Sequence, residues 1–220
     1  MPKSQESYIR QMQESYTAIN GVMEDSVLLE YATMHGYGKT KLKAMLKEWN
    51  RVMELINIYG REDIEKEDAT KALGDGVDDL YRDYLRHLEL SRTRFKRAPE
   101  VLEKLGAFGA RKRTQTGIMD EIRLFYDTAL HDEAARSGLD DIQICKDELQ
   151  TEYDAIMHLF ELKQQQEKEE ADVQRARVIR DEALEALEDD VNDMKSYVTI
   201  EAEYNGEEHR LEKAGIRVRS

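Results

Sequence analysis

Cysteine, proline and long apolar runs are scarce in this sequence of 220 residues, and each scarcity excludes a class of protein. The single cysteine, Cys145, excludes an internal disulfide and offers no zinc or redox spacing, which favours a reducing compartment. No apolar run approaches the roughly 18 residues of a membrane helix, and the first residues lack the apolar core of a signal peptide. We therefore expect a cytoplasmic protein without a membrane span.

The composition predicts an all-α fold. Only two prolines occur, Pro2 and Pro99, and the commonest residues are mostly good helix formers. Charged residues make up 36% of the chain against 40% hydrophobic residues, a ratio typical of long helices that each bury one narrow stripe. We expect an elongated bundle of long antiparallel helical hairpins, and the formal charge of −14 indicates good solubility.

Apolar residues recur at three- and four-residue steps along the chain, and glycines divide this pattern into segments. We expect Gly60 to end one helix, Gly138 to stop another, and the polar run 163–172 to form a hairpin turn that lets two stripes be buried. A continuous solvated helix through 163–172 is the alternative. The predicted parts are a long N-terminal helix (1–35), a first hairpin (36–106), a basic loop and connecting helix (107–137), and a second hairpin (138–215).

The two predicted hairpins resemble each other. Gly36 and Gly138 each precede a long helix, and the two passages end at Gly106 and Gly215. The segment 75–80 of the first also echoes the segment 189–194 of the second. The likeness fits either an internal duplication or chance similarity between two acidic helical passages.

The order of these landmarks resembles a group of uncharacterised all-helical bacterial proteins of Bacteroidetes type, with repeated long hairpins. The likeness covers about residues 36–215 and depends on Gly36-Tyr37-Gly38, Leu105-Gly106, Arg111-Lys112-Arg113, and Gly117 ahead of Phe125-Tyr126. The resemblance implies a fold and no established activity.

Motifs for catalysis or metal binding are not visible. A di-iron bundle needs a glutamate three residues before a histidine, and none of the five histidines has one. Asp83 with His87, and Asp154 with His158, fit exposed polar pairs better than metal ligands. Cys145 falls on an apolar stripe, where we expect it to pack as a small hydrophobic residue. We therefore expect no enzyme activity, no metal and no cofactor.

The sharpest local feature is a basic region in the middle of the chain. Ten cations stand against five acids between Arg86 and Arg123, which gives this stretch a charge of +5 in an acidic protein. The candidate anion- or partner-binding residues are Arg94, Arg97, Arg111, Lys112 and Arg113. The patch suits phosphate groups, but the acidic remainder of the chain would oppose a nucleic acid and favours pairing of the patch with acidic segments, such as 161–208, of a neighbouring helix or of another copy.

Three functional hypotheses follow. The first is a non-enzymatic helical interaction or scaffold protein that self-associates, because long helices with one stripe each make a thin core that a partner would extend. The second is an anion- or nucleic-acid-binding module that uses the central basic patch. The third is a helical protein that rearranges to act on membranes, against which the lack of an apolar hairpin tip argues.

Overall fold

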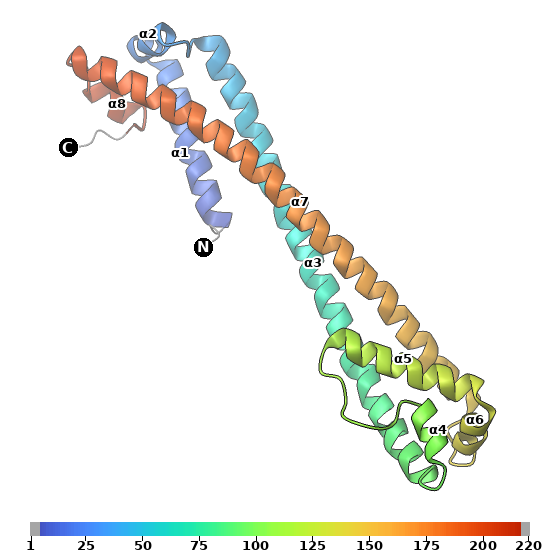
Figure 1. Ribbon diagram of the computed structural model, residues 1–220. Coiled ribbons are helices and arrows are strands. Elements are labelled where there is room, and N and C mark those ends of the chain that lie inside the picture. The colour runs from blue at the N-terminus through green and yellow to red at the C-terminus, as the bar shows by residue number, and fades with distance from the viewer. Residues whose placement is uncertain (1–4, 217–220) are drawn as a thin grey trace. The chain divides into compact units, whose positions relative to one another are not determined.

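The computed structural model describes residues 5–216, and this part of the chain is all-α, as the composition predicted. Its helices, shown in Figure 1, are α1 (Gln5–Glu24), α2 (Ser26–Met34), α3 (Lys39–Arg94), α4 (Pro99–Lys104), α5 (Gln115–His131), α6 (Glu133–Asp140), α7 (Lys146–Tyr204) and α8 (His209–Lys213). Two of them, α3 and α7, contain 56 and 59 residues.

The two long helices overturn the predicted hairpins 36–106 and 138–215. Gly60 lies inside α3, and the polar run 163–172 lies inside α7, so neither point turns the chain. A glycine costs a helix only about 1 kcal/mol, which packing on both sides outweighs. The polar run is supported by side-chain pairs such as Gln166 Nε2 donating to Glu170 Oε1 at 2.7 Å. The alternative of a continuous helix through 163–172 is therefore correct.

Aspartates, rather than glycines, divide the shorter helices. The predicted N-terminal helix 1–35 is broken at Asp25, whose carboxylate accepts the N–H groups of Val27 and Leu28 at the start of α2. Asp132 caps α6 in the same way. Gly138 does not stop a helix, because it lies within α6, where a Cβ would meet the Phe95 ring at 2.3 Å. Its lack of a side chain allows that close approach.

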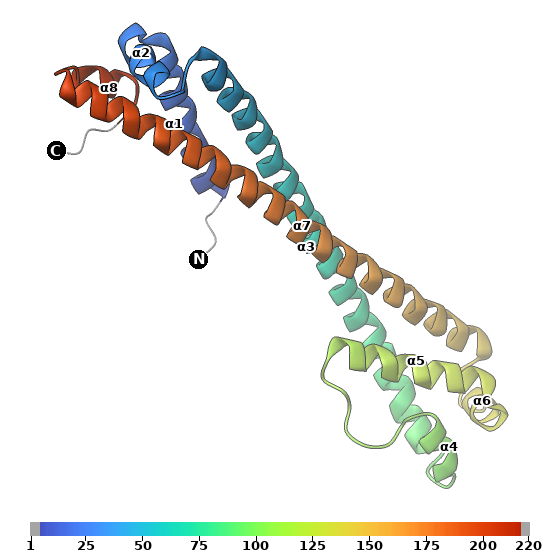
Figure 2. The same ribbon diagram turned by 45° about the horizontal axis from the view of Figure 1, so that its top comes forward.

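The chain forms two compact units, and each has its own hydrophobic core. Unit 1 combines the residues up to Ile64 with those from Ala171 onward, and unit 2 is Glu65–Glu170. The core of unit 1 draws on α1, α2, α8, the first part of α3 and the last part of α7. The core of unit 2 draws on α4, α5, α6, the last part of α3 and the first part of α7. In Figure 2 the loop after α4 runs back to the start of α5 within unit 2.

The helix order is repeated along the chain. The series α1, α2, α3, α4 is followed by α5, α6, α7, α8, with similar lengths at each place. Asp132 follows its counterpart Asp25 by 107 positions (132 − 25), and α7 begins 107 positions after α3. Gly106 and Gly215, 109 positions apart (215 − 106), both have positive φ, of 63° and 70°. We call residues 5–107 and 115–216 repeat 1 and repeat 2.

Burial follows the same register in both repeats. Buried pairs 107 positions apart include Met12 and Met119, Val22 and Ala129, Leu28 and Ala135, Leu42 and Leu149, Leu80 and Leu187. The predicted counterparts Gly106 and Gly215 are correct. The predicted counterpart of Gly36 is wrong, because the other residue that leaves a helix with positive φ at this point is Gln143 rather than Gly138. The predicted echo between 75–80 and 189–194 is also out of register.

Each unit is built from both repeats. Unit 1 takes α1 and α2 from repeat 1 and α8 from repeat 2, and unit 2 takes α4 from repeat 1 and α5 and α6 from repeat 2. An ion pair joins the two contributions within each unit. Arg210 of α8 donates to Asp25 at 3.0 Å, and Lys104 of α4 donates to Asp132 at 2.6 Å.

Candidate functional site

Two of the five predicted basic site residues are engaged within unit 2. Arg94, at the end of α3, donates to Asp141 Oδ2 at 2.5 Å and lies 5.6 Å from the centre of the Phe95 ring. Arg111 lies in the loop before α5, with only 17% of its side chain exposed. The other three predicted residues are exposed: Arg97, Lys112 and Arg113.

Arg111 organises the loop that carries it. Its Nη1 donates to the hydroxyl of Tyr84 at 2.6 Å, and its Nη2 donates to the carbonyl oxygens of Gly106 and Phe108 at 3.2 and 2.8 Å. Glu121 of α5 lies 3.8 Å from its guanidinium and also accepts the backbone N–H of Lys112 at 3.2 Å. These contacts hold the segment Phe108–Arg113, which we call the loop segment, between α3 and α5.

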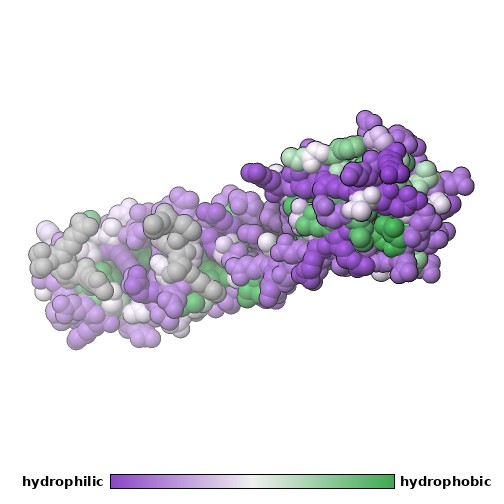
Figure 3. All heavy atoms as spheres, turned by 90° about the horizontal axis from the view of Figure 1, so that it is seen from below, coloured by the Kyte–Doolittle hydropathy of each residue, from purple (hydrophilic) through white to green (hydrophobic). Residues whose placement is uncertain are grey.

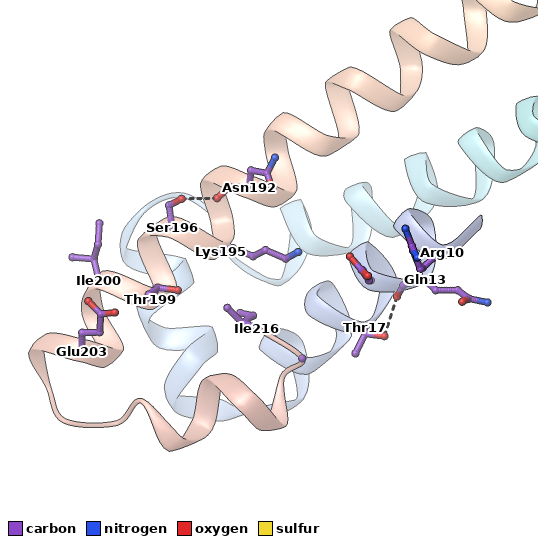
Figure 4. Close-up of a pocket in the computed structure, with 12 residues that line it drawn as sticks. Arg10, Gln13, Thr17, Asn192, Lys195, Ser196, Thr199, Ile200, Glu203 and Ile216 are labelled. Atoms are coloured by element: carbon purple, nitrogen blue, oxygen red, sulfur yellow. Dashed lines mark hydrogen bonds between the residues drawn. The ribbon is translucent and has the colours of Figure 1, made fainter. Parts of the chain in front are cut away.

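Among the residues that the structure describes, the corresponding place in unit 1 is an open groove. Its volume is about 860 Å³, within the range of ligand pockets, roughly 300–1,000 Å³. Its walls are α1, the last part of α7, and Gly215–Ile216, as Figure 4 shows. The polar lining residues are Arg10, Gln13, Glu14, Thr17, Asn192, Lys195, Ser196, Thr199 and Glu203.

Corresponding positions of the two repeats line the two places. Glu14 of the groove corresponds to Glu121, and Gly215 corresponds to Gly106. One lining residue differs between the two places. Lys195 lines the groove of unit 1, whereas the corresponding residue of unit 2 is the buried Leu88. The groove of unit 1 therefore keeps the carboxylate that holds the loop segment in unit 2, without a described segment of the chain across it.

Lys195 is the half-buried cation of the groove. Its side chain extends from α7 toward α1 in Figure 4. Burial lowers the pKa of Lys195, while the carboxylates of Glu14 and Glu188 act in the opposite direction. The Lys195 ammonium is therefore partly desolvated, and the carboxylates of Glu14 and Glu188 stabilise its charge.

Exposed apolar side chains lie beside this groove. Tyr197, Ile200 and Tyr204 are three and four residues apart on α7, which places them on one helix face. Ile200 lines the groove and is 61% exposed, and Tyr204 is 87% exposed. We call these three residues the α7 stripe. Hydrophobic residues also reach the surface in separate patches among hydrophilic ones on the face drawn in Figure 3.

A buried polar cluster in unit 2 was not predicted. His87 is 1% exposed, and its two ring nitrogens lie 3.0 Å from the hydroxyl of Tyr126 and 3.0 Å from Glu148 Oε1. Burial lowers the pKa of His87, against the opposing effect of Glu148, and burial raises the pKa of Tyr126. The cluster is polar core, whereas repeat 2 has Met194 at the position of His87.

Two sequence predictions about single residues are wrong. His87 was expected to form an exposed pair with Asp83, but its ring faces Tyr126 and Glu148 inside unit 2. Cys145 was expected to pack in the core, but it is exposed, because it lies in the turn before α7 rather than on a helix stripe. Apolar spacing could predict neither environment. The turn that exposes Cys145 and the buried partners of His87 both depend on tertiary contacts.

The groove itself could have been found from the sequence through the correct register. Shifting the chain by 107 positions places Glu14 on Glu121 and Lys195 on Leu88. The register predicted from Gly36 and Gly138 differs from this one by five positions. In that register Glu14 and Glu121 would not fall on corresponding helix faces, and neither would Lys195 and Leu88.

Comparison of the chain with protein-family models, curated proteins and solved structures found no match. Within residues 5–216, no helix is long and apolar enough to cross a membrane.

Proposed function

We propose that this protein is a non-enzymatic helical interaction protein that associates with other polypeptides, including further copies of itself, through unit 1. The observation that carries the proposal is the α7 stripe beside the open groove. A stripe of exposed aromatic and aliphatic side chains next to a concave surface is typical of protein-binding sites. Unit 2 differs at two of the three corresponding positions, because Thr93 and Arg97 replace Ile200 and Tyr204, while Tyr197 is matched by the exposed Leu90.

Light scattering tests the self-association. We expect a mass above that of one chain at about 0.1 M salt and no lower mass at about 0.5 M, because apolar contacts withstand the screening that weakens ion pairs. A loss of mass at the higher salt would instead favour contact between basic and acidic surfaces.

A matched pair of substitutions locates the contact. Ile200→Glu should return the protein to a single-chain mass, because it places a charge in the stripe. Ile64→Glu is the control, since Ile64 is also 61% exposed and also lies on a long helix of unit 1. Equal masses for the two variants and the unaltered chain would contradict the assignment of the contact to the stripe.

Anion binding by the central basic region is the second candidate function. The exposure of Arg97, Lys112 and Arg113 supports it, because these side chains are open to a ligand. Replacing all three with alanine should abolish a salt-sensitive affinity for a single-stranded oligonucleotide, while the solution mass stays the same. Arg111 is left unchanged in this variant because it holds the loop segment.

A further inference from the structure

We infer that unit 1 of one copy binds unit 2 of a second copy through corresponding faces of the two long helices. The inference rests on the proposed function, since it names the partner surface that the α7 stripe contacts. Opposite charges at corresponding positions of the two repeats support it.

Each long helix has an exposed face in its last turns. Residues four, eight and eleven positions after a given residue lie on the same side of a helix as that residue. All residues of the two faces are exposed within the described part of the chain. We call Arg82, Arg86, Leu90 and Thr93 the α3 face, and we call Asp189, Asp193, Tyr197 and Ile200 the α7 face.

The two faces correspond position by position, and their charges are opposite. A shift of 107 positions places both arginines of the α3 face on the aspartates of the α7 face. The same reversal extends to a neighbouring position, because Lys96 corresponds to Glu203. Two faces of equal charge would repel each other, whereas these two attract. The charge pattern therefore favours the α3 face of a second copy, rather than a second α7 face, as the partner.

The two arginines of the α3 face are open to a partner. Their side chains are 76% exposed at Arg82 and 64% exposed at Arg86. Within unit 2, Arg82 pairs with Asp79 of its own helix at 3.1 Å, and Arg86 lies 4.0 Å from Glu148. Ion pairs between exposed side chains contribute little stability, so neither pair prevents contact with a further acid.

The α7 face offers two acids next to apolar side chains. Neither Asp189 nor Asp193 has an ion-pair partner among residues 5–216. Tyr197 and Ile200 follow them along the face, with 39% and 61% exposure, and Leu90 is 37% exposed on the α3 face. The two faces therefore offer both apolar contacts and ion pairs, as protein interfaces do.

Parallel packing of the two helices matches the faces best. In that alignment each arginine meets its corresponding aspartate, and Leu90 meets Tyr197. In the antiparallel alignment Leu90 would meet Asp193, which would desolvate the carboxylate without an ion pair. Charged residues beside an apolar contact set the orientation of paired helices in this way. The apolar contacts keep the copies together at higher salt, whereas the ion pairs mainly set the register and the association rate.

Sedimentation equilibrium of the full chain at about 0.1 M salt tests the contact. Arg86→Asp and Asp193→Arg should each lower the association constant about tenfold, because an attractive pair becomes a repulsive one. An equimolar mixture of these two variants should associate as strongly as the unaltered chain, since each variant then meets an opposite charge on the other. Arg61→Asp is the matched control and should leave the association constant unchanged, because Arg61 is exposed on α3 but lies outside the α3 face.

Three outcomes would overturn the inference. If Arg86→Asp associates like the unaltered chain, then the α7 face does not meet the α3 face. If the mixture associates no more strongly than its two components, then the two charges lie in different contacts. A single-chain mass for the unaltered chain would exclude a second copy as the partner. The proposed function is judged separately, because Ile200→Glu should still abolish association if the α7 stripe meets another surface.

Discussion

Two glycine-to-alanine substitutions should change stability in opposite directions, because one glycine faces a backbone and the other faces open space. A Cβ at Gly21 of α1 would lie 2.4 Å from Cα and 2.8 Å from the carbonyl oxygen of Ala214, just after α8. A Cβ at Gly74 of α3 would meet no atom within 4 Å. Both glycines lie inside helices, so the gain in helix propensity is the same for both.

The magnitudes follow from these contacts. Alanine in place of a helical glycine gains about 0.5–1 kcal/mol, which is the whole effect expected for Gly74→Ala. At Gly21 the new methyl group must displace backbone, and such overpacking costs about 1–3 kcal/mol, with a backbone contact at the upper end. The net change for Gly21→Ala is therefore a loss of about 2 kcal/mol. For a unit of about 100 residues that unfolds in its own transition, that corresponds to a midpoint roughly 8–16 °C lower.

Calorimetry is the suitable assay, because it can resolve the unfolding of two compact units as separate transitions. We expect Gly21→Ala to lower the transition of unit 1 and Gly74→Ala to raise that of unit 2 by a few degrees. If Gly21→Ala raises its midpoint as much as Gly74→Ala does, then the chain after α8 does not pack on α1 as described. The wall of the groove formed by Gly215–Ile216 would then be misplaced as well.

Two further predictions concern buried or capping polar groups. His87→Met, which copies Met194 of repeat 2, should reduce the loss of stability on acidification. Burial lowers the pKa of His87, so the unaltered protein loses stability as the pH falls below the ordinary value of 6.5 and the unfolded chain takes up the proton. Urea unfolding at several pH values measures this, and an unchanged pH dependence would contradict the role of His87. Asp132→Ala should cost about 1 kcal/mol at neutral pH through the lost helix cap. Lys104 and the N–H of Ala135 lower the pKa of Asp132, so this difference should vanish as acid protonates the carboxylate, and a constant difference would refute the assignment.

The local pattern was a good guide to helix and a poor guide to helix ends. Apolar periodicity correctly predicted helix around Leu42, Leu80 and Leu187, since one buried face imposes that spacing whatever the partner. Gly60 was expected to end a helix, but its small local cost was outweighed by packing on both sides of it. The turn expected in 163–172 failed for a similar reason, since polar side chains stabilise a helix along its surface as readily as a turn.

The candidate site shows the same division. The sequence identified the basic region, but Arg111 is engaged by Tyr84 and by loop carbonyl groups, contacts that depend on a helix 27 residues earlier. Glu14 and Lys195 carried no signal individually, because a lone acid and a lone lysine on amphipathic helices resemble any solvated pair. They form one site only because α1 and the last part of α7 share the core of unit 1.

The sequence by itself determined the all-α class, the apolar faces of the helices and the recurrence of Gly106 at Gly215, because these depend on residue type and short-range spacing. Tertiary structure alone decided that each compact unit takes helices from both repeats. That arrangement depends on contacts between residues far apart in the chain, such as Asp25 with Arg210, which no local period encodes. It also decided that the loop segment lies between α3 and α5 in unit 2, and that Glu14, Lys195 and the α7 stripe come together at one groove in unit 1, because both depend on where distant segments lie in space.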